Sequence, residues 1–328
     1  MRLETRIDYD YEHFDDGRDP AAGISGKYLN LILNGSFNEH FSYAYRQRIL
    51  PSTGNKSLFD GTDWLYLTYK INDRFSVAAG KQVFMEGGFE YDLAPIDVYF
   101  WSDYWNNVRC YQMGATLTYT DKSKHNSFVF QFANSNYSDA TLSNLYAYNL
   151  VWYGNYEHWR TIYSVNMVEY RKGYFMNYIV LGNKFVFDDF SFYVDFMNRA
   201  TDKQDNFLFD DYSLIGRADW RVRDNLNLFV KGGYDTNKSE PYMGSSAQNY
   251  RDIFVLPGVE YNYYGIGAEF YPLKGKQDIR LHGFVAVKNF SQEKALGAFE
   301  KNNRIHFNVG VTWRIDMLRG LKTIISKN

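Results

Sequence analysis

Basic side chains recur at alternate positions along several stretches of this sequence, and their chemistry is that of anion binding. Apolar residues separate them, so an extended chain would present charged and apolar side chains on opposite faces. The basic residues that such faces would gather are Arg6, Arg46, Arg48, Arg217, Arg221, Lys231, Arg280 and Arg314. Acidic residues on the same faces are fewer. For any single basic residue, a charge pair with a neighbouring strand is an equally good explanation of its position. The collective excess predicts a wall that attracts anions.

The segment from residue 84 to 109 differs from the rest of the chain because it interleaves acidic side chains with aromatic rings. The residues that we single out are Glu86, Glu90, Asp92, Asp97, Asp103, Trp101 and Trp105. A loop this aromatic is unfavourable in water, since each ring that is buried removes on the order of 150–250 Å² of surface from solvent. We expect the segment to fold inward, place its acids opposite Arg6, Arg46 and Arg48, and form a constriction.

The sequence gives little support to catalysis or metal binding. Nucleophilic catalysis needs a nucleophile beside a general base, but neither Ser164 nor Ser213 is placed with a histidine. His282 and His306 are expected on one face of two late strands, with no third ligand for a metal. Cys110 is the single cysteine, which excludes an internal disulfide. We predict no enzymatic activity, no metal and no cofactor.

The composition narrows the class of protein further. Tyrosine, phenylalanine and tryptophan make up 19% of the 328 residues, yet the mean hydropathy is only -0.47. Tyrosine rings with a polar hydroxyl suit a membrane interface. The formal net charge of -2 argues against a nucleic-acid partner. Because no stretch of ~18 apolar residues occurs, a membrane protein with this sequence would have to be a β-barrel.

Alternation of apolar and polar residues is the main signal for secondary structure, and it predicts antiparallel strands along the whole chain. The last predicted strand sets Ile305, Phe307 and Val309 against Arg304 and His306. A lysine or arginine facing lipid at mid-bilayer would cost roughly 2–4 kcal/mol, so the charged faces should look inward. Many inward charges require water. The pattern therefore predicts a barrel around an aqueous channel.

The lengths of the connections between predicted strands alternate, as they do in outer-membrane barrels. The short turns fall near 38–40, 72–74, 121–126, 154–158, 187–190, 223–225 and 273–278. The longer loops fall near 13–24, 50–62, 84–110, 135–143, 200–211, 236–260 and 289–303. This pattern predicts about sixteen strands, with the turns in the periplasm and loops such as those at Asn55, Lys203 and Ser245 outside the cell.

Several short motifs resemble one known family. They are Gly80-Lys81-Gln82, Gly87-Gly88, Pro95-Ile96-Asp97, the stretch from Gly267 to Leu273, and Val311-Thr312-Trp313. Together they are similar to the phosphate-selective porin O and P family, in the form common among Bacteroidetes-type bacteria. The resemblance implies a trimeric porin with sixteen strands whose third outer loop narrows the pore. The acidic third loop of this sequence argues for a general channel with some anion preference over specific selection of phosphate.

The sequence as a whole predicts one transmembrane β-barrel over residues 1–315 and a periplasmic tail over 316–328. The predicted function is passive diffusion of small hydrophilic solutes and ions across the outer membrane of a Gram-negative bacterium. The expected partners are outer-membrane lipid, lipopolysaccharide and two further copies of the chain in a homotrimer. Two alternatives are a plugged barrel that serves a larger envelope complex and a soluble β-sandwich. Steady conductance would separate a porin from the first, and solubility without detergent would indicate the second.

Overall fold

The computed structural model describes residues 1–49, 59–137, 144–202, 204–238, 255, 257–293 and 299–317. Antiparallel strands dominate the described residues. Their bounds are β1 Arg2–Phe14, β2 Ala21–Ser36, β3 Phe41–Arg48, β4 Thr62–Lys70, β5 Phe75–Val83, β6 Tyr111–Thr120, β7 Asn126–Asn134, β8 Tyr146–Asn155, β9 Trp159–Arg171, β10 Tyr174–Phe187, β11 Phe190–Ala200, β12 Asp211–Arg223, β13 Leu226–Asn237, β14 Val259–Phe270, β15 Ile279–Glu293, β16 Phe299–Lys301 and β17 Arg304–Asp316.

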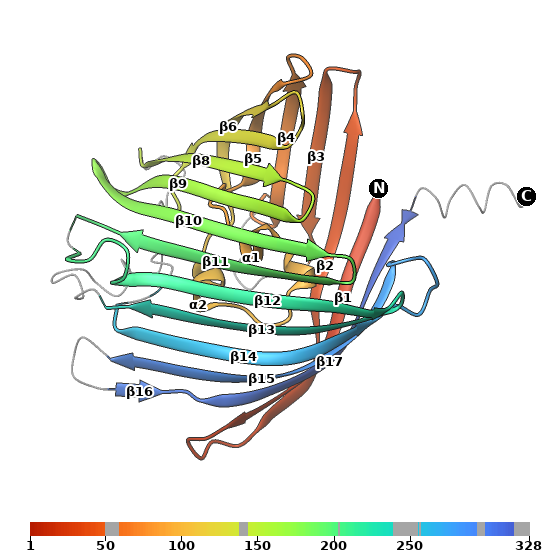
Figure 1. The fold of residues 1–328 in the computed structure, drawn as a ribbon, viewed down its shortest axis with the longest axis vertical. Coiled ribbons are helices and arrows are strands. Elements are labelled where there is room, and N and C mark those ends of the chain that lie inside the picture. Colours follow the sequence, from red (N-terminus) through yellow and green to blue (C-terminus); the bar gives the residue numbers. More distant parts are fainter. Residues whose placement is uncertain are drawn as a thin grey trace, which may run out of the picture.

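The sheet closes on itself, because β1 pairs with β2 on one side and with β17 on the other. The closing register runs from Arg2 opposite Asp316 to Phe14 opposite Arg304. The short β16 pairs with β15 beyond the point where β17 begins, so sixteen strands make up the wall. Figure 1 shows the barrel from the side, with opposite walls crossing because the strands are tilted. The predicted sixteen-stranded barrel is confirmed.

The two faces of the wall differ as the alternation predicts. Apolar side chains cover the outside, where Trp220 is 54% exposed and Ile266 is 65% exposed. Polar and charged side chains such as Lys231 and Asp235 lie on the inside and are buried. The outer face therefore fits a hydrocarbon environment. In the part of the chain that the structure describes, no helix has the length and apolar character needed to cross a membrane.

The connections follow the predicted alternation, with one exception. The first strand starts and the last strand ends at the same rim as short turns such as residues 188–189 between β10 and β11. At the other rim, β9 and β10 are joined by only Lys172 and Gly173, a connection absent from the predicted loops. Gly173 has a φ of 76°, which permits this tight turn. Residues Asn55, Lys203 and Ser245 themselves lie outside the described residues, as does the predicted tail from residue 318 onward.

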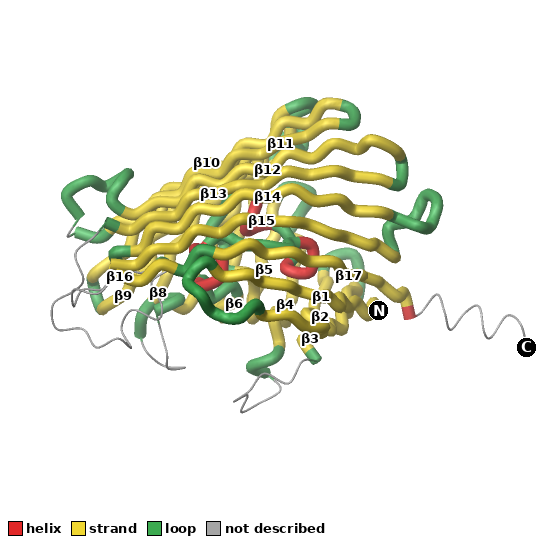
Figure 2. The backbone as a smooth tube through the Cα atoms, turned by 90° about the horizontal axis from the view of Figure 1, so that it is seen from below, coloured by secondary structure: helices red, strands yellow, loops and turns green. Residues whose placement is uncertain are grey.

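Residues 84–110, between β5 and β6, form an inward segment that lies within the barrel, as Figures 1 and 2 show. It contains two short helices, α1 (Phe89–Asp92) and α2 (Asp103–Asn107), and a 3-10 turn, η1 (Pro95–Asp97). Its rings form an apolar core with rings of the barrel wall. The buried members from the segment are Phe84, Tyr91, Tyr99, Phe100 and Tyr104, and those from the wall include Tyr178, Phe229, Tyr263 and Phe284.

Candidate functional site: the barrel interior

The inward segment leaves β5 through two glycines that allow it to turn against the wall. Gly87 and Gly88 have φ angles of 104° and 85°, a region that residues with side chains rarely adopt. A Cβ atom on Gly87 would lie 2.8 Å from the Oγ of Ser164 in β9. The Ser164 hydroxyl donates to the carbonyl oxygen of Glu86 at this contact. The chain therefore approaches β9 more closely than any side chain would permit.

Glu86 lies at this close approach and is completely buried. Neither of its carboxylate oxygens has a hydrogen-bond partner among the described residues. Burial raises the pKa of Glu86 well above its ordinary value, and the positive charge of Arg199 offsets only part of this effect. A neutral carboxyl group is the form that this environment favours.

Buried side chains of β11 and β13 hold the two helices of the inward segment. The Asp195 carboxylate accepts the backbone N–H groups of Phe89 and Glu90, both at 2.8 Å. Lys231 forms an ion pair with the Glu90 carboxylate and donates to the carbonyl oxygen of Phe100. The start of α2 is held in the same way, because Asp235 accepts the N–H of Asp103 at 3.0 Å. These contacts use charged groups as structural anchors.

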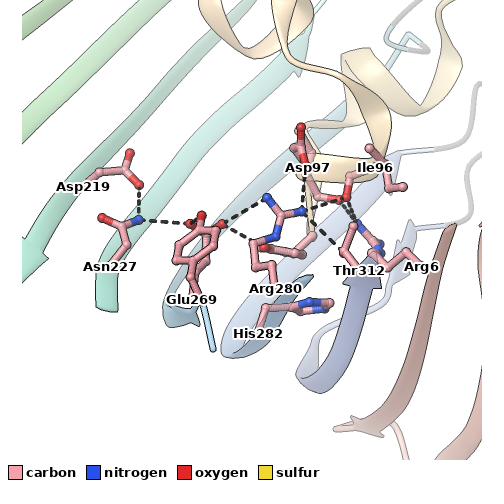
Figure 3. A network of polar contacts seen from close by, with 12 residues as sticks. Arg6, Ile96, Asp97, Asp219, Asn227, Glu269, Arg280, His282 and Thr312 are labelled. Carbon is pink, nitrogen blue, oxygen red and sulfur yellow. Dashed lines mark hydrogen bonds and ion pairs between the residues drawn. The ribbon is translucent and has the colours of Figure 1, made fainter. Parts of the chain in front are cut away.

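Arginines of β1, β15 and β17 hold the 3-10 turn in the middle of the segment. Figure 3 shows Arg6 of β1 and Arg280 of β15 beside this turn. The Arg6 guanidinium donates to the carbonyl oxygens of Ile96 and Val98 at 3.0 and 2.7 Å. Arg280 and Arg314 both contact the Asp97 carboxylate, at 2.7 and 2.5 Å. Burial acts to raise the pKa of Asp97, but these two guanidinium groups outweigh it and keep the pKa below its usual value. Asp97 therefore stays ionised.

The wall of β2, β3 and β4 lies on the other side of the segment, and its charges are arranged differently. The Asp63 carboxylate pairs with the Nε atoms of both Arg46 and Arg48, at 2.7 and 2.8 Å. Arg46 is buried, its guanidinium carbon 4.1 Å from the ring centroid of Trp64, and it donates to the Tyr111 hydroxyl at 2.7 Å. The Arg48 side chain is 46% exposed. This triad of two cations and one anion carries a net positive charge.

Two cavities meet at this wall, one toward each rim of the barrel. The cavity toward the rim of longer loops, called here the outer cavity, is lined by Tyr28, Arg46, Arg48, Asp60, Lys81, Pro95, Trp101, Trp105, Asn106, Val108, Arg109, Cys110, Tyr111 and Gln112. The periplasmic cavity is lined by Arg2, Glu4, Ile32, Asn34, Arg46, Trp64, Ala94, Asp97, Tyr271, Gln277, Asp278, Arg280 and Arg314. Arg46 lines both cavities. From the segment, Ala94 lines the periplasmic cavity and Pro95 lines the outer cavity.

Comparison with known proteins identifies the family of this chain. A family model described as phosphate-selective porin O and P matches residues 1–168. The chain belongs to this family. No curated protein matches the sequence.

Solved structures of other outer-membrane proteins share the fold of this porin at low sequence identity. OmpT of Vibrio cholerae in its trimer form is 12% identical, with 96% of this chain and 99% of that chain covered and a TM-score of 0.62. An anion-selective porin from Comamonas acidovorans is 10% identical, with 96% and 98% covered and a TM-score of 0.63. The outer membrane channel DcaP of Acinetobacter baumannii is 12% identical, with 96% of each chain covered and a TM-score of 0.63. Family and fold together identify an outer-membrane porin of a Gram-negative bacterium.

The remaining basic residues predicted for the inner wall of this porin lie toward the periplasmic rim. Arg217 pairs with Asp219 at 2.7 Å, and its guanidinium carbon lies 4.4 Å from the ring centroid of Phe229. Arg221 is exposed and lines a further cavity with Asp219 and Arg217. These two arginines therefore line a different cavity from the one that contains Arg46 and Arg48.

The acids of the inward segment do not face Arg46 and Arg48 as expected. Glu90 pairs with Lys231, Asp97 pairs with Arg280 and Arg314, and Asp92 is exposed. Arg6 does contact the segment, but through the carbonyl oxygens described above and not through a carboxylate. The segment packs against the wall from β7 to β15, and Glu90 and Asp97 contact cations of β13, β15 and β17 rather than those of β3.

Asp63 is the important residue that the sequence analysis missed. Simple alternation from Leu65 and Leu67 would place position 63 on the lipid side. A β-bulge shifts the register between Arg46 and Gln47, so that Thr62 pairs with Gln47 and Trp64 pairs with Arg46. The extra residue in the bulge is Asp63, which is fully buried against the two arginines. An acid next to a tryptophan at the start of a strand is the only sequence signal.

The serines and histidines considered for catalysis take part in structural contacts. The Ser213 hydroxyl accepts from Arg199 at 2.9 Å and donates to Asp235. His282 lies 3.3 Å from Asp8, and His306 lies 2.9 Å from Asp10. Among the residues that the structure describes, no group of three or more histidine, cysteine or acidic side chains is arranged to hold a metal ion.

Proposed function

We propose that this porin is a diffusion channel with a preference for anions, and that the path of the solute runs between the inward segment and the wall of β2–β4. The observation that carries the proposal is the triad of Arg46, Asp63 and Arg48, which places a net positive charge where the two cavities meet. A charge on the wall of a narrow pore acts strongly on a passing ion, because the low-dielectric wall focuses its field. One similar structure is that of an anion-selective porin.

In this proposal the inward segment, with the predicted boundaries 84–109, is the constriction of the pore. Ala94 and Pro95 approach the wall at Arg46, and the contacts to Asp195, Lys231 and Arg6 hold them there. Glu90 and Asp97 of the segment contribute little negative field to the path because they are paired with cations. Of the eight predicted basic residues, Arg46 and Arg48 act on solutes in this proposal, whereas Arg6, Lys231, Arg280 and Arg314 hold the constriction. Arg217 and Arg221 line a further cavity.

The proposal includes the assembly and chemical role of the protein. A single barrel over 1–315 with a periplasmic tail at 316–328 would form a homotrimer in lipid and lipopolysaccharide, as the similar structure in trimer form suggests. The channel would act without enzymatic chemistry, on small ions and solutes in its pore. A plugged accessory barrel remains the alternative, and it predicts no steady channels when the purified protein is added to a planar bilayer.

Replacing Arg48 by glutamate tests the charge preference. Arg48→Glu removes the exposed cation of the triad while Arg46 keeps its pairing with Asp63, so the barrel should fold. The permeability ratio of potassium to chloride, obtained from the reversal potential in a KCl gradient, should rise several-fold at low salt. The rise should be smaller at high salt because salt screens the charge. Lys122→Glu, in the exposed turn between β6 and β7, is the matched control and should leave the ratio unchanged. An unaltered ratio in Arg48→Glu would show that the path avoids β3.

A further inference from the structure

The outer cavity combines two features that ordinary ion passage does not require: a stacked pair of indole rings and a cationic wall. We propose that it is a binding subsite for organic anions that carry a ring, with the ring on Trp101 and Trp105 and the anionic group on Arg48. The inference deepens the proposed function, because it names the class of solute that the anion path favours. Trp101 and Trp105 come from the inward segment, whereas Arg46 and Arg48 come from β3.

The indole pair is a preformed surface. The ring centroids of Trp101 and Trp105 lie 3.7 Å apart with an interplanar angle of 24°. Ser102 fixes the turn between them, since its hydroxyl accepts the N–H of Trp105 at 3.2 Å and donates to the buried Glu90 carboxylate at 2.6 Å. The Lys231 ammonium lies 5.8 Å from the ring centroid of Trp101. Both tryptophans remain partly exposed, and a flat solute can stack on such rings with little loss of entropy.

The opposite side of the cavity supplies the charge. Asp63 compensates one of the two arginines, and the Arg48 side chain, 46% exposed, is the one that reaches water. A guanidinium group binds carboxylate or phosphate through two parallel N–H donors. Tyr28 and Tyr111 add hydroxyl groups to the same lining, and Lys81 and Arg109 outnumber the one lining acid, Asp60. An anionic group is therefore favoured beside the ring surface.

The periplasmic cavity lacks this combination. Its four basic residues, Arg2, Arg46, Arg280 and Arg314, stand against three acids, Glu4, Asp97 and Asp278. A single indole, Trp64, lines it, and the Arg46 guanidinium covers that ring. A solute that needs both a ring contact and an excess of positive charge would bind in the outer cavity.

Block of the chloride current in planar bilayers tests the subsite with four probe anions. Benzoate and glucose 6-phosphate carry a ring, whereas acetate and inorganic phosphate carry the same anionic groups without one. Each ring-bearing anion should block at about tenfold lower concentration than its ringless counterpart. The comparison between benzoate and glucose 6-phosphate distinguishes a preference for aromatic rings from one for sugar rings. Equal block within both pairs would overturn the subsite.

Variants of the cavity locate the binding. Trp101→Leu should raise the blocking concentration of benzoate to near that of acetate while acetate itself is unaffected, and Arg48→Gln should weaken block by all four anions. Trp220→Leu on the lipid face is the matched control, and each anion should block this variant at the same concentration as the wild type. Heat-modifiable mobility on electrophoresis confirms folding of each variant. Should Trp101→Leu fail to fold, Trp101→Phe should give an intermediate blocking concentration, and no change in either variant would contradict the proposal.

Failure of the subsite can be separated from failure of the proposed function. An anion-selective reversal potential together with equal block by benzoate and acetate would reject the subsite and leave the anion channel intact. A cation-selective reversal potential would reject the anion channel.

Discussion

Two parts of the inner wall carry similar residues and use them in opposite ways. The covered wall, β7–β15, presents Asp195, Lys231 and Asp235 to the inward segment, and all three are buried in contacts with it. The open wall, β2–β4, presents Arg46 and Arg48, which pair with an acid of their own wall. The first set of charges holds a structure. The second lines the cavities along which the proposed solute path runs.

The comparison shows that the role of an inward charge depends on what is packed against it. Over the covered wall the segment excludes water, so each charge needs a partner, because an unpaired buried charge is costly. Over the open wall, water and solutes solvate the exposed charge. A porin interior can therefore combine a packed core on one side with an aqueous path on the other.

Removing the inward segment should have the largest effect on conductance, because neither wall would then be covered. Replacement of residues 86–105 by a Gly and Ser linker should raise single-channel conductance several-fold and admit larger sugars in liposome swelling. The physical reason is that the path would widen by the space that the segment and its apolar core now occupy. Conductance equal to that of the wild type in a folded variant would show that the constriction lies elsewhere.

Breaking one contact of the covered wall should have an intermediate effect. Lys231→Met leaves the Glu90 carboxylate buried without its cation, which should lower the free energy of unfolding by about 3–5 kcal/mol and increase open-channel current noise. The double variant Lys231→Met/Glu90→Gln removes both charges and should recover much of the stability. Denaturant unfolding in detergent measures the first effect, and bilayer recording measures the second.

A matched change on the open wall sharpens the contrast. Arg48→Gln leaves Asp63 paired with Arg46, so the free energy of unfolding should fall much less than in Lys231→Met. Equal destabilisation by the two substitutions would mean that the walls do not differ in the way proposed.

The fold could be predicted from the sequence because its signals are local. Alternation fixes which side of a strand faces lipid, and turn residues fix where it ends. The roles of inward residues could not be predicted in this way. Arg6 and Arg48 both occupy inward positions of the alternating pattern. Arg6 is nevertheless buried and donates to the carbonyl oxygens of residues 96 and 98, whereas Arg48 is exposed. That difference depends on contacts about ninety residues apart in the sequence, as the separations of 90 and 92 for Arg6 show.

Glu86 tests whether the covered wall is dry, and the expected effect on stability is small. Its carboxyl group is fully buried without a hydrogen-bond partner among the described residues, and burial raises its pKa. In the unfolded chain a glutamate titrates near pH ~4.3. Above that pH the unfolded chain releases the proton while the folded chain keeps it, so the stability of the wild type falls as the pH rises toward the folded pKa.

Glu86→Gln removes this titration and keeps the shape of the side chain. The variant should therefore unfold at nearly the same denaturant concentration as the wild type at pH 4, and at a higher concentration than the wild type at pH 8. Glu157→Gln, in the exposed turn between β8 and β9, is the control and should show no such divergence. If the midpoints of Glu86→Gln and wild type differ by the same amount at both pH values, Glu86 is ionised in the folded protein. Water must then reach the base of the inward segment, and the covered wall would be wetter than its packing indicates.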